Sequence, residues 1–133
     1  MSLLLLADPS REVVESYIHR GRCFVAQSNG KIIGEYVLLD TRPQTVEIVN
    51  VAVVEEEHGK GIGKQLVRHA ITTANSMGYK TIEVGTGNSS VGYQKCGFRI
   101  IGVDRDFFTV HYDEPIYENG MQCRDMVRLA LSL

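Results

Sequence analysis

The sequence lacks the features that would direct it to a membrane, to a disulfide framework or to nucleic acid. Its opening aliphatic run, Leu3 to Leu6, is far too short for a membrane span or for the core of a signal peptide. A formal net charge of −2 provides no excess of lysine and arginine for nucleic acid. The cysteines are far apart and have no paired spacing, which is typical of a reducing compartment; they are Cys23, Cys96 and Cys123. These absences predict a cytoplasmic enzyme or binding domain without a membrane or nucleic-acid partner.

The chain also has no repeats, low-complexity tracts or linkers. Its 133 residues are enough for one domain with a sizeable core but not for two, so we expect a single domain over residues 1–133. An apolar fraction of 44% places the chain among ordinary globular proteins rather than disordered ones. No metal site is expected, because the four histidines show no metal-ligand spacing; they are His19, His58, His69 and His111.

Apolar spacing and turn residues predict a mixed α/β chain. A helix is expected over residues 10–19, capped by Asp8 or Ser10 and ended by Gly21, and residues 2–7 are either a first strand or a first helix. Apolar residues at intervals of three and four predict the main helix over 62–77, and a short helix is expected over 90–95. A loop is expected over 113–120. The expected strands cover residues 23–27, 32–39, 45–54, 80–85, 98–103, 105–110 and 122–131.

The most informative segment is residues 58–64, with the sequence HGKGIGK, which lies between an apolar strand and the main helix. Its alternating glycines, Gly59, Gly61 and Gly63, allow the backbone to approach a ligand closely. The helix that follows presents its free N–H groups and positive dipole end to the loop, an arrangement that binds anions such as phosphate. The spacing matches neither a nucleotide triphosphate P-loop nor a dinucleotide fingerprint. The loop alone leaves ATP, a dinucleotide and coenzyme A open as ligands.

A second motif favours coenzyme A. Residues 93–98, with the sequence YQKCGF, follow the next strand and match Tyr-x-x-x-Gly-Phe, while residues 58–63 match Arg/Gln-x-x-Gly-x-Gly/Ala with His58 in the first position. Together these motifs resemble the GNAT (Gcn5-related N-acetyltransferase) superfamily over roughly residues 20–131. The resemblance implies an α/β GNAT fold with a mixed, twisted central sheet, splayed central strands and helices on both faces.

The resemblance also implies sites for acetyl-CoA, the cosubstrate. The backbone of the central strand would pair with the pantetheine arm, the glycine loop would hold the pyrophosphate, and Asn88 matches an asparagine that contacts pantetheine. The implied cofactor-binding residues are Val51, Ala52, Val53, His58, Gly59, Lys60, Gly61, Ile62, Gly63, Lys64 and Asn88.

For catalysis, the resemblance implies Tyr93 near the sulfur, where a neutral phenol of pKa about 10 can protonate the departing thiolate. Glu47 matches a strand position where several family members carry a glutamate base that acts through water; the alternative is a strand-end charge facing solvent. Asn50 is a further candidate for holding that water, and the Val53 N–H for polarising the thioester carbonyl. Cys96 is interpreted as a small buried hydrophobe, with a covalent acyl-cysteine as the alternative, and His111 as a possible acceptor contact.

The sequence thus predicts an N-acetyltransferase that moves an acetyl group from acetyl-CoA to a primary amine, by direct attack in a ternary complex. The acceptor, a small molecule or a peptide, is not readable from the sequence. The alternatives are a catalytically inactive acyl-CoA-binding module, suggested by a segment between Asn88 and Tyr93 that is shorter than in the family, and a nucleotide-binding domain. Because dimers are common in the family, the resemblance also allows a homodimer.

Overall fold

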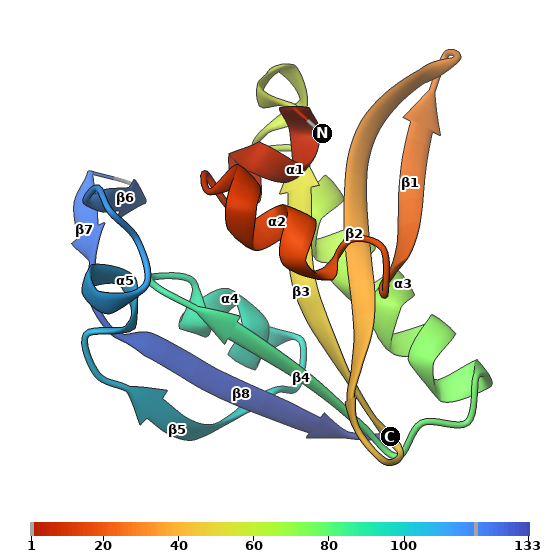
Figure 1. Ribbon diagram of the computed structural model, residues 1–133. Helices are drawn as coiled ribbons and strands as arrows, with labels where there is room; N and C mark the ends of the chain where they lie inside the picture. Colours follow the sequence, from red (N-terminus) through yellow and green to blue (C-terminus); the bar gives the residue numbers. More distant parts are fainter. Residues whose placement is uncertain (1, 119) are drawn as a thin grey trace.

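A computed structural model describes residues 2–118 and 120–133, and six strands form one mixed sheet in the order β1-β2-β3-β4-β8-β5 (Figure 1). All neighbouring strands are antiparallel except β3 and β4, which are parallel. A separate ribbon of two short strands, β6 and β7, lies beyond one end of the sheet. The strands are β1 (Arg22–Ser28), β2 (Lys31–Arg42), β3 (Thr45–Val53), β4 (Thr81–Thr86), β5 (Arg99–Asp104), β6 (Ile116–Glu118), β7 (Met121–Cys123) and β8 (Met126–Ser132).

The two parallel strands separate before they end. Their register runs from Thr45 opposite Thr81 to Ile48 opposite Val84 and stops there. Beyond this point β3 stays paired with β2 as far as Val53, whereas β4 stays paired with β8, so a wedge opens between them (Figure 1). The predicted splayed central strands are confirmed.

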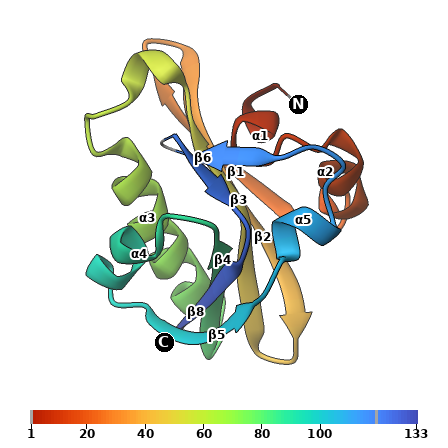
Figure 2. The ribbon, with the colours of Figure 1, turned by 90° about the vertical axis from the view of Figure 1, so that its left-hand side faces the viewer.

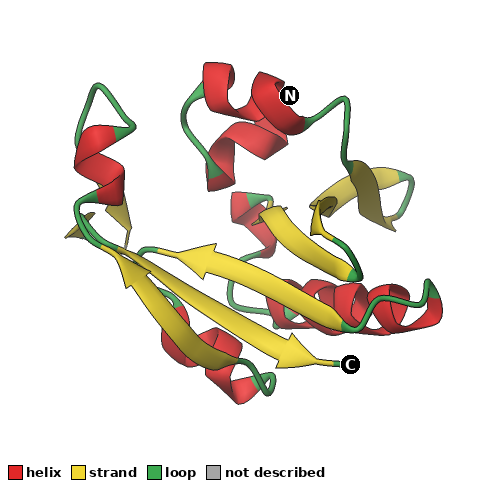
Figure 3. Ribbon diagram, turned by 60° about the horizontal axis from the view of Figure 1, so that its bottom comes forward, coloured by secondary structure: helices red, strands yellow, loops and turns green. Residues whose placement is uncertain are grey.

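Helices cover both faces of the sheet, as predicted (Figure 3). The main helix α3 packs on one face together with α4, and α1 and α2 pack on the other. Figure 2 shows α5 on the side where α1 and α2 lie. The helices are α1 (Ser2–Ala7), α2 (Arg11–Tyr17), η1 (Glu55–Glu57, a 3-10 turn), α3 (Ile62–Ser76), α4 (Ser90–Lys95) and α5 (Phe107–Val110).

The core lies mainly between the sheet and α3. Leu66 and Ala70 of α3 meet Tyr36, Ile82 and Leu129 of the sheet, all buried. Burial of each large side chain is worth about 1.5–3 kcal/mol, and this face therefore fixes α3 mainly over β2 and β3. A smaller cluster of Leu4, Val14, Tyr17 and Val37 fixes α1 and α2 on the opposite face. Among the described residues, no helix has the length and apolarity needed to cross a membrane.

The N-terminal elements follow their local signals. Residues 2–7 form the helix rather than the strand of the two predicted alternatives. The Ser10 hydroxyl caps α2 by accepting a hydrogen bond from the Val13 N–H, at 3.2 Å, while the Asp8 carboxylate accepts from the Ser10 N–H. Asp8 therefore positions the cap but is not the cap.

The prediction of a strand over 105–110 is wrong, because residues Phe107–Val110 form a helical turn, α5. Asp106 adopts a left-handed φ of 57°, and its carbonyl accepts hydrogen bonds from the N–H groups of Thr109 and Val110. Aromatic and β-branched residues favour strands only where a neighbouring strand can pair with them.

The strand predicted over 122–131 is broken, and the same turn explains the break. The Phe108 N–H donates to the Arg124 carbonyl at 2.9 Å, and the Asp106 N–H donates to the Asp125 carboxylate at 2.8 Å. Residues 124 and 125 thus bind α5 instead of continuing a ladder, and β7 and β8 form on either side. The loop predicted over 113–120 contains β6, and Asn119 lies outside the described residues.

Candidate active site

The glycine loop leads into α3 through two residues with left-handed backbone. Gly59 and Gly61 have φ of 80° and 78°, values that side-chain-bearing residues rarely adopt. A Cβ on either glycine would meet nothing within 4 Å, so the backbone conformation, rather than space within the protein, requires glycine here. Gly61 is the N-cap of α3 and has no side chain to occupy the helix end.

The start of α3 leaves donors free for an anion. The first helical hydrogen bond runs from the Gln65 N–H to the Gly61 carbonyl, so the amides of Ile62, Gly63 and Lys64 precede it. The first turn carries no acidic residue that would oppose an anion. The loop and helix therefore fit the pyrophosphate of coenzyme A in backbone geometry and in charge.

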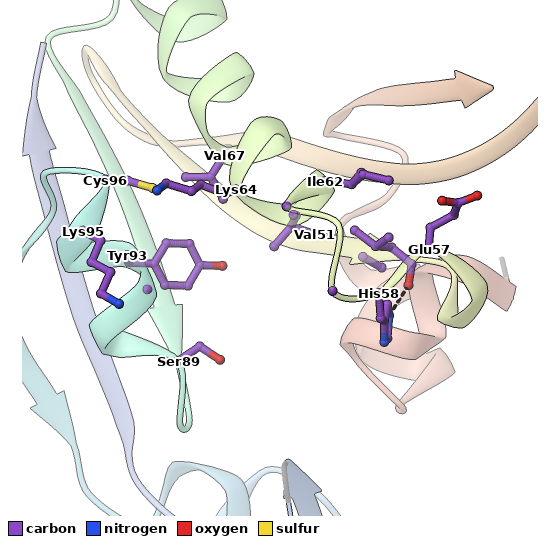
Figure 4. Close-up of a pocket in the computed structure, with 16 residues that line it drawn as sticks. Val51, Glu57, His58, Ile62, Lys64, Val67, Ser89, Tyr93, Lys95 and Cys96 are labelled. Atoms are coloured by element: carbon purple, nitrogen blue, oxygen red, sulfur yellow. Dashed lines mark hydrogen bonds between the residues drawn. The ribbon is translucent and has the colours of Figure 1, made fainter.

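An open cavity of about 590 Å³ lies between this loop, β3 and α4 (Figure 4). Two lysines, Lys64 and Lys95, contribute positive charge to its lining, and Cys96 contributes an apolar surface. Most of the predicted site residues meet in this cavity: Val51, Ala52, Val53, His58, Gly59, Gly61, Ile62, Gly63, Lys64 and Tyr93. The sequence did not single out Glu57, Val67, Ser89, Gly92 or Lys95.

His58 connects the loop to the central strand. Its Nε2 lies 2.7 Å from the Val53 carbonyl oxygen (Figure 4), and because a carbonyl only accepts, the imidazole must donate. The Val54 N–H donates to the Ile33 carbonyl on β2. The N–H and C=O groups of Val53 therefore point away from β2, toward the edge of β3 where the wedge opens. The Val53 carbonyl is therefore held by the loop, and its N–H faces the wedge.

Three predicted residues lie outside the cavity. Lys60 forms an ion pair with Glu57, at 2.7 Å. The Asn88 amide donates to the Met121 carbonyl on β7, at 3.3 Å. Glu47 lies opposite Glu83, one position before the pairing of β3 and β4 ends. The proposed roles of these three residues in binding and catalysis stay predictions.

Glu47 is a half-buried carboxyl in a charged setting. Burial raises its pKa, the nearby Glu83 carboxylate raises it further, and the guanidinium groups of Arg128 and Arg42 lower it. Arg42 forms an ion pair with Glu83. The Glu47 carboxyl is therefore partly desolvated, and its role as base stays a prediction.

A second cavity, of about 650 Å³, lies on the other side of β3, between the end of α1, the wedge and the α5 region. It shares Val51, Ala52, Val53, His58, Ser89 and Tyr93 with the first cavity, so the two meet at the wedge. Figure 4 shows the Tyr93 ring extending from α4 toward β3. Its ring packs edge-on against Phe98, with centroids 5.8 Å apart, which fixes the direction of the side chain.

The end of the second cavity away from the glycine loop is built from residues far apart in the sequence. Tyr112 donates its hydroxyl to the Asp8 carboxylate at 3.1 Å, and the Asn50 amide donates to the Leu4 carbonyl at 3.0 Å and to the Tyr17 hydroxyl at 2.8 Å. Burial raises the pKa of Asp8, and it raises the pKa of Tyr17 to about 12. His111, a predicted acceptor contact, is exposed and does not line this cavity, whereas its neighbour Tyr112 does.

The sequence offered no signal for this end of the cavity. Asp8 and Tyr112 are separated by 104 positions, and Asp8 was interpreted only as a helix cap. Among the described residues, no group of three or more histidine, cysteine, aspartate or glutamate side chains is arranged to hold a metal ion.

Comparison with known proteins agrees with this geometry. A family model described as an acetyltransferase (GNAT) domain matches residues 19–100. A Bacillus subtilis protein named "Uncharacterized N-acetyltransferase YvbK" is 61% identical, and the match covers 98% of this chain and 87% of that protein.

Two solved structures show the same fold with ligands. A Bacillus subtilis acetyltransferase in complex with CoA is 60% identical and superimposes with a TM-score of 0.92, covering 99% of this chain and 90% of that one. A GNAT family acetyltransferase from Elizabethkingia anophelis with acetyl-CoA bound is 46% identical, with a TM-score of 0.93 and coverage of 99% and 89%.

Proposed function

Because the chain belongs to the GNAT acetyltransferase family and is an acyltransferase that uses acetyl-CoA, we propose that it acetylates a primary amine by direct attack in a ternary complex. The observation that carries this proposal is the meeting of two cavities at the wedge, with Tyr93 lining both. A cavity on each side of one wedge lets the acyl donor and the acceptor bind at the same time. No covalent acyl-enzyme is then needed.

The first cavity is assigned to acetyl-CoA. The amides of Ile62, Gly63 and Lys64 and the positive end of α3 would hold the pyrophosphate, with His58 and Gly59 at the start of the loop. The free edge of Val51, Ala52 and Val53 would pair with the pantetheine arm. For Asn88 to contact pantetheine, its amide would have to break its hydrogen bond to the Met121 carbonyl. For Lys60 to contact a phosphate, its ammonium would have to break its ion pair with Glu57.

The reaction forms one bond and breaks another. The amine nitrogen attacks the thioester carbonyl carbon, the C–N bond forms, the C–S bond breaks, and the sulfur leaves as a thiolate. The Val53 N–H, which faces the wedge, would stabilise the negative charge that develops on the carbonyl oxygen.

Two protons must move during this reaction. The attacking nitrogen must lose one, and Glu47 would accept it through water. Asn50, which lines the acceptor cavity, is a candidate to hold that water. The departing sulfur would take the other proton from Tyr93. A phenol, of ordinary pKa about 10, is a weaker acid than a thiol, at about 8.5, but by a small enough margin to share its proton in the transition state. The proton on Glu47 would then return to Tyr93 through water.

Replacement of Tyr93 by Phe tests the proposal. The variant keeps the ring that packs on Phe98 and removes only the hydroxyl. We expect kcat for CoA release with a panel of amines to fall roughly 10²–10⁴-fold, the range for general acid catalysis, while the Kd for acetyl-CoA stays within about threefold. Tyr79→Phe, which removes a hydroxyl bound to Asp40 away from both cavities, is the matched control.

The other outcomes separate the alternatives. If the wild type binds acetyl-CoA but acetylates no amine of the panel, the chain is an acyl-CoA-binding module. If ATP or NAD stabilises the protein against heat more than CoA does, the glycine loop is a nucleotide site. A Tyr93→Phe variant with wild-type kcat would remove Tyr93 from the mechanism.

A further inference from the structure

We propose that the acceptor is an aliphatic amine with a second, positively charged amino group, which Asp8 binds against the rings of Phe108 and Tyr112 while the first amine reacts at the wedge. This inference rests on the proposed function. It names the class of substrate that the second cavity selects.

The net charges of the residues that line the two cavities have opposite signs. Lys64, Lys95 and Glu57 line the acetyl-CoA cavity, where Glu57 is paired with Lys60, whereas Asp8 and Glu55 line the acceptor cavity. Over the described residues, no lysine or arginine is part of the acceptor cavity lining. An acceptor that carries a carboxylate or a phosphate would meet only like charge there, and a cation would meet opposite charge.

Asp8 is a partly buried carboxylate without a cation. Its Oδ1 accepts hydrogen bonds from the Ser10 N–H and the Tyr112 hydroxyl, both at 3.1 Å, and in the described part of the chain no lysine or arginine forms an ion pair with it. Burial raises its pKa more than these two hydrogen bonds lower it. An ammonium group bound beside Asp8 would place a positive charge next to this carboxylate and stabilise its ionised form.

Aromatic rings complete this end of the cavity. Phe108 and Tyr112 both line it, with ring centroids 5.8 Å apart and planes inclined by 31°, and Tyr117 lines it as well. Ring faces attract a cation within about 6 Å and pack against a methylene chain, but they offer nothing to an anion. The rings therefore favour the same ligand as the carboxylate does.

Asn50 is a second polar residue in the lining of this cavity. Asn50 is 3% exposed, and its Oδ1 has no hydrogen-bond partner among the described residues. Its amide orientation is fixed, because Nδ2 must face the Leu4 carbonyl, which only accepts. Because Oδ1 is closed off from the cavity, Asn50 supports the site through its amide, which holds the Leu4 carbonyl of α1.

Asn50 and Asp8 are directly connected. The Leu4 carbonyl accepts hydrogen bonds from the Asn50 amide at 3.0 Å and from the Asp8 N–H at 3.1 Å. Asn50 belongs to β3 next to the wedge, and Asp8 follows α1. Asn50 and Asp8 are therefore held in one arrangement, which fixes the position of the Asp8 carboxylate at the end of the acceptor cavity away from the glycine loop.

The test compares acceptors of equal length. Diamines from 1,3-diaminopropane to 1,6-diaminohexane are each compared with the monoamine and the amino acid of the same chain length, and kcat/KM is measured by CoA release. We expect the best diamine to exceed its monoamine by roughly ten- to a hundredfold, the worth of one buried charge-assisted hydrogen bond, and the amino acid to be poorest. Equal values for the three, or a preference for the amino acid, would overturn the inference.

Substitution then tests Asp8 itself. Asp8→Asn keeps an Oδ1 for the Ser10 and Tyr112 donors and removes the charge, so KM for the diamine should rise by roughly tenfold or more while kcat/KM for the monoamine changes less than about twofold. Glu12→Gln, an exposed change on α2 with the same loss of charge, is the control and should change neither. Tyr112→Phe keeps the ring and should give a smaller loss for the diamine than Asp8→Asn.

The outcomes distinguish the two proposals. If no amine is acetylated although acetyl-CoA binds, the proposed function fails. If monoamines are acetylated as well as diamines, or if Asp8→Asn affects both equally, the proposed function holds and the assignment of Asp8 is wrong.

Discussion

His58 donates a hydrogen bond of 2.7 Å to the carbonyl oxygen of Val53, which joins the first residue of the glycine loop to the last residue of β3. Both residues line both cavities. The bond closes a short loop around η1 and ties the start of the glycine loop to the end of the strand that faces the wedge. His58 occupies the motif position that is Arg or Gln in the family pattern, and its side chain binds the backbone of this protein at Val53.

Substitutions at His58 separate this bond from a contact with phosphate. His58→Ala should weaken CoA binding by roughly three- to tenfold, because one hydrogen bond of about 1 kcal/mol no longer holds the loop. His58→Gln, whose amide N–H can also donate to Val53, should recover most of the affinity. Isothermal titration with CoA measures both. Equal affinities for the alanine variant and the wild type would show that the loop needs no such support.

The acetyl-CoA cavity was largely predictable from the sequence because its residues are close together in the chain. The loop, the start of α3 and the end of β3 occupy residues 51–64, and turn and helix-start chemistry act over such short ranges. Tyr93 came from a second motif, and the structure brings it to the same cavity on α4. Its role, like those of the other site residues, stays a prediction.

The acceptor cavity was not predictable because only the fold assembles it. The sequence points to His111 rather than to its neighbour Tyr112, because no periodicity in this segment indicates which side chain faces the cavity; in the structure Tyr112 lines the cavity and His111 is exposed. The strand predicted over 105–110 failed for a related reason: Asp125 binds the Asp106 N–H and stabilises a turn that local propensity does not reveal. Contacts over long sequence separations decide both cases.

Glu47 offers a prediction on pH. A general base must be ionised, so activity should fall as the pH drops through the pKa of Glu47, and burial places that fall at a higher pH than for an ordinary glutamate. Glu83→Gln removes the carboxylate that raises this pKa, so the acidic limb of the kcat profile should move to lower pH with little change in its plateau. Stopped-flow or steady-state CoA release from pH 5 to 9 gives the profile.

Glu47→Gln completes this experiment. It should lower kcat roughly 10²–10⁴-fold and leave acetyl-CoA affinity unchanged, because the cavity that binds acetyl-CoA does not include this side chain. If Glu47→Gln keeps its activity and Glu83→Gln leaves the acidic limb in place, the base is a different group.

Glu35 gives a prediction on stability that does not depend on the active site. It lies in the middle of β2, is 2% exposed, and neither carboxylate oxygen has a hydrogen-bond partner in the described part of the chain. Burial raises its pKa from 4.5 to about 7. Between these two values the folded protein keeps a proton that the unfolded chain has released, so stability falls as the pH rises from about 4.5 through about 7.

Glu35→Gln removes the charge and nearly preserves the shape. At pH 8 the variant should be more stable than the wild type by on the order of 1–3 kcal/mol, and the difference should shrink toward pH 5, where the wild-type carboxyl is protonated in the folded state. Urea unfolding at both pH values measures the free energies, with Glu56→Gln, an exposed change of equal charge, as the control. A variant that is less stable than the wild type at pH 8 would mean that the Glu35 carboxylate has a favourable partner, such as ordered water, that compensates for its burial.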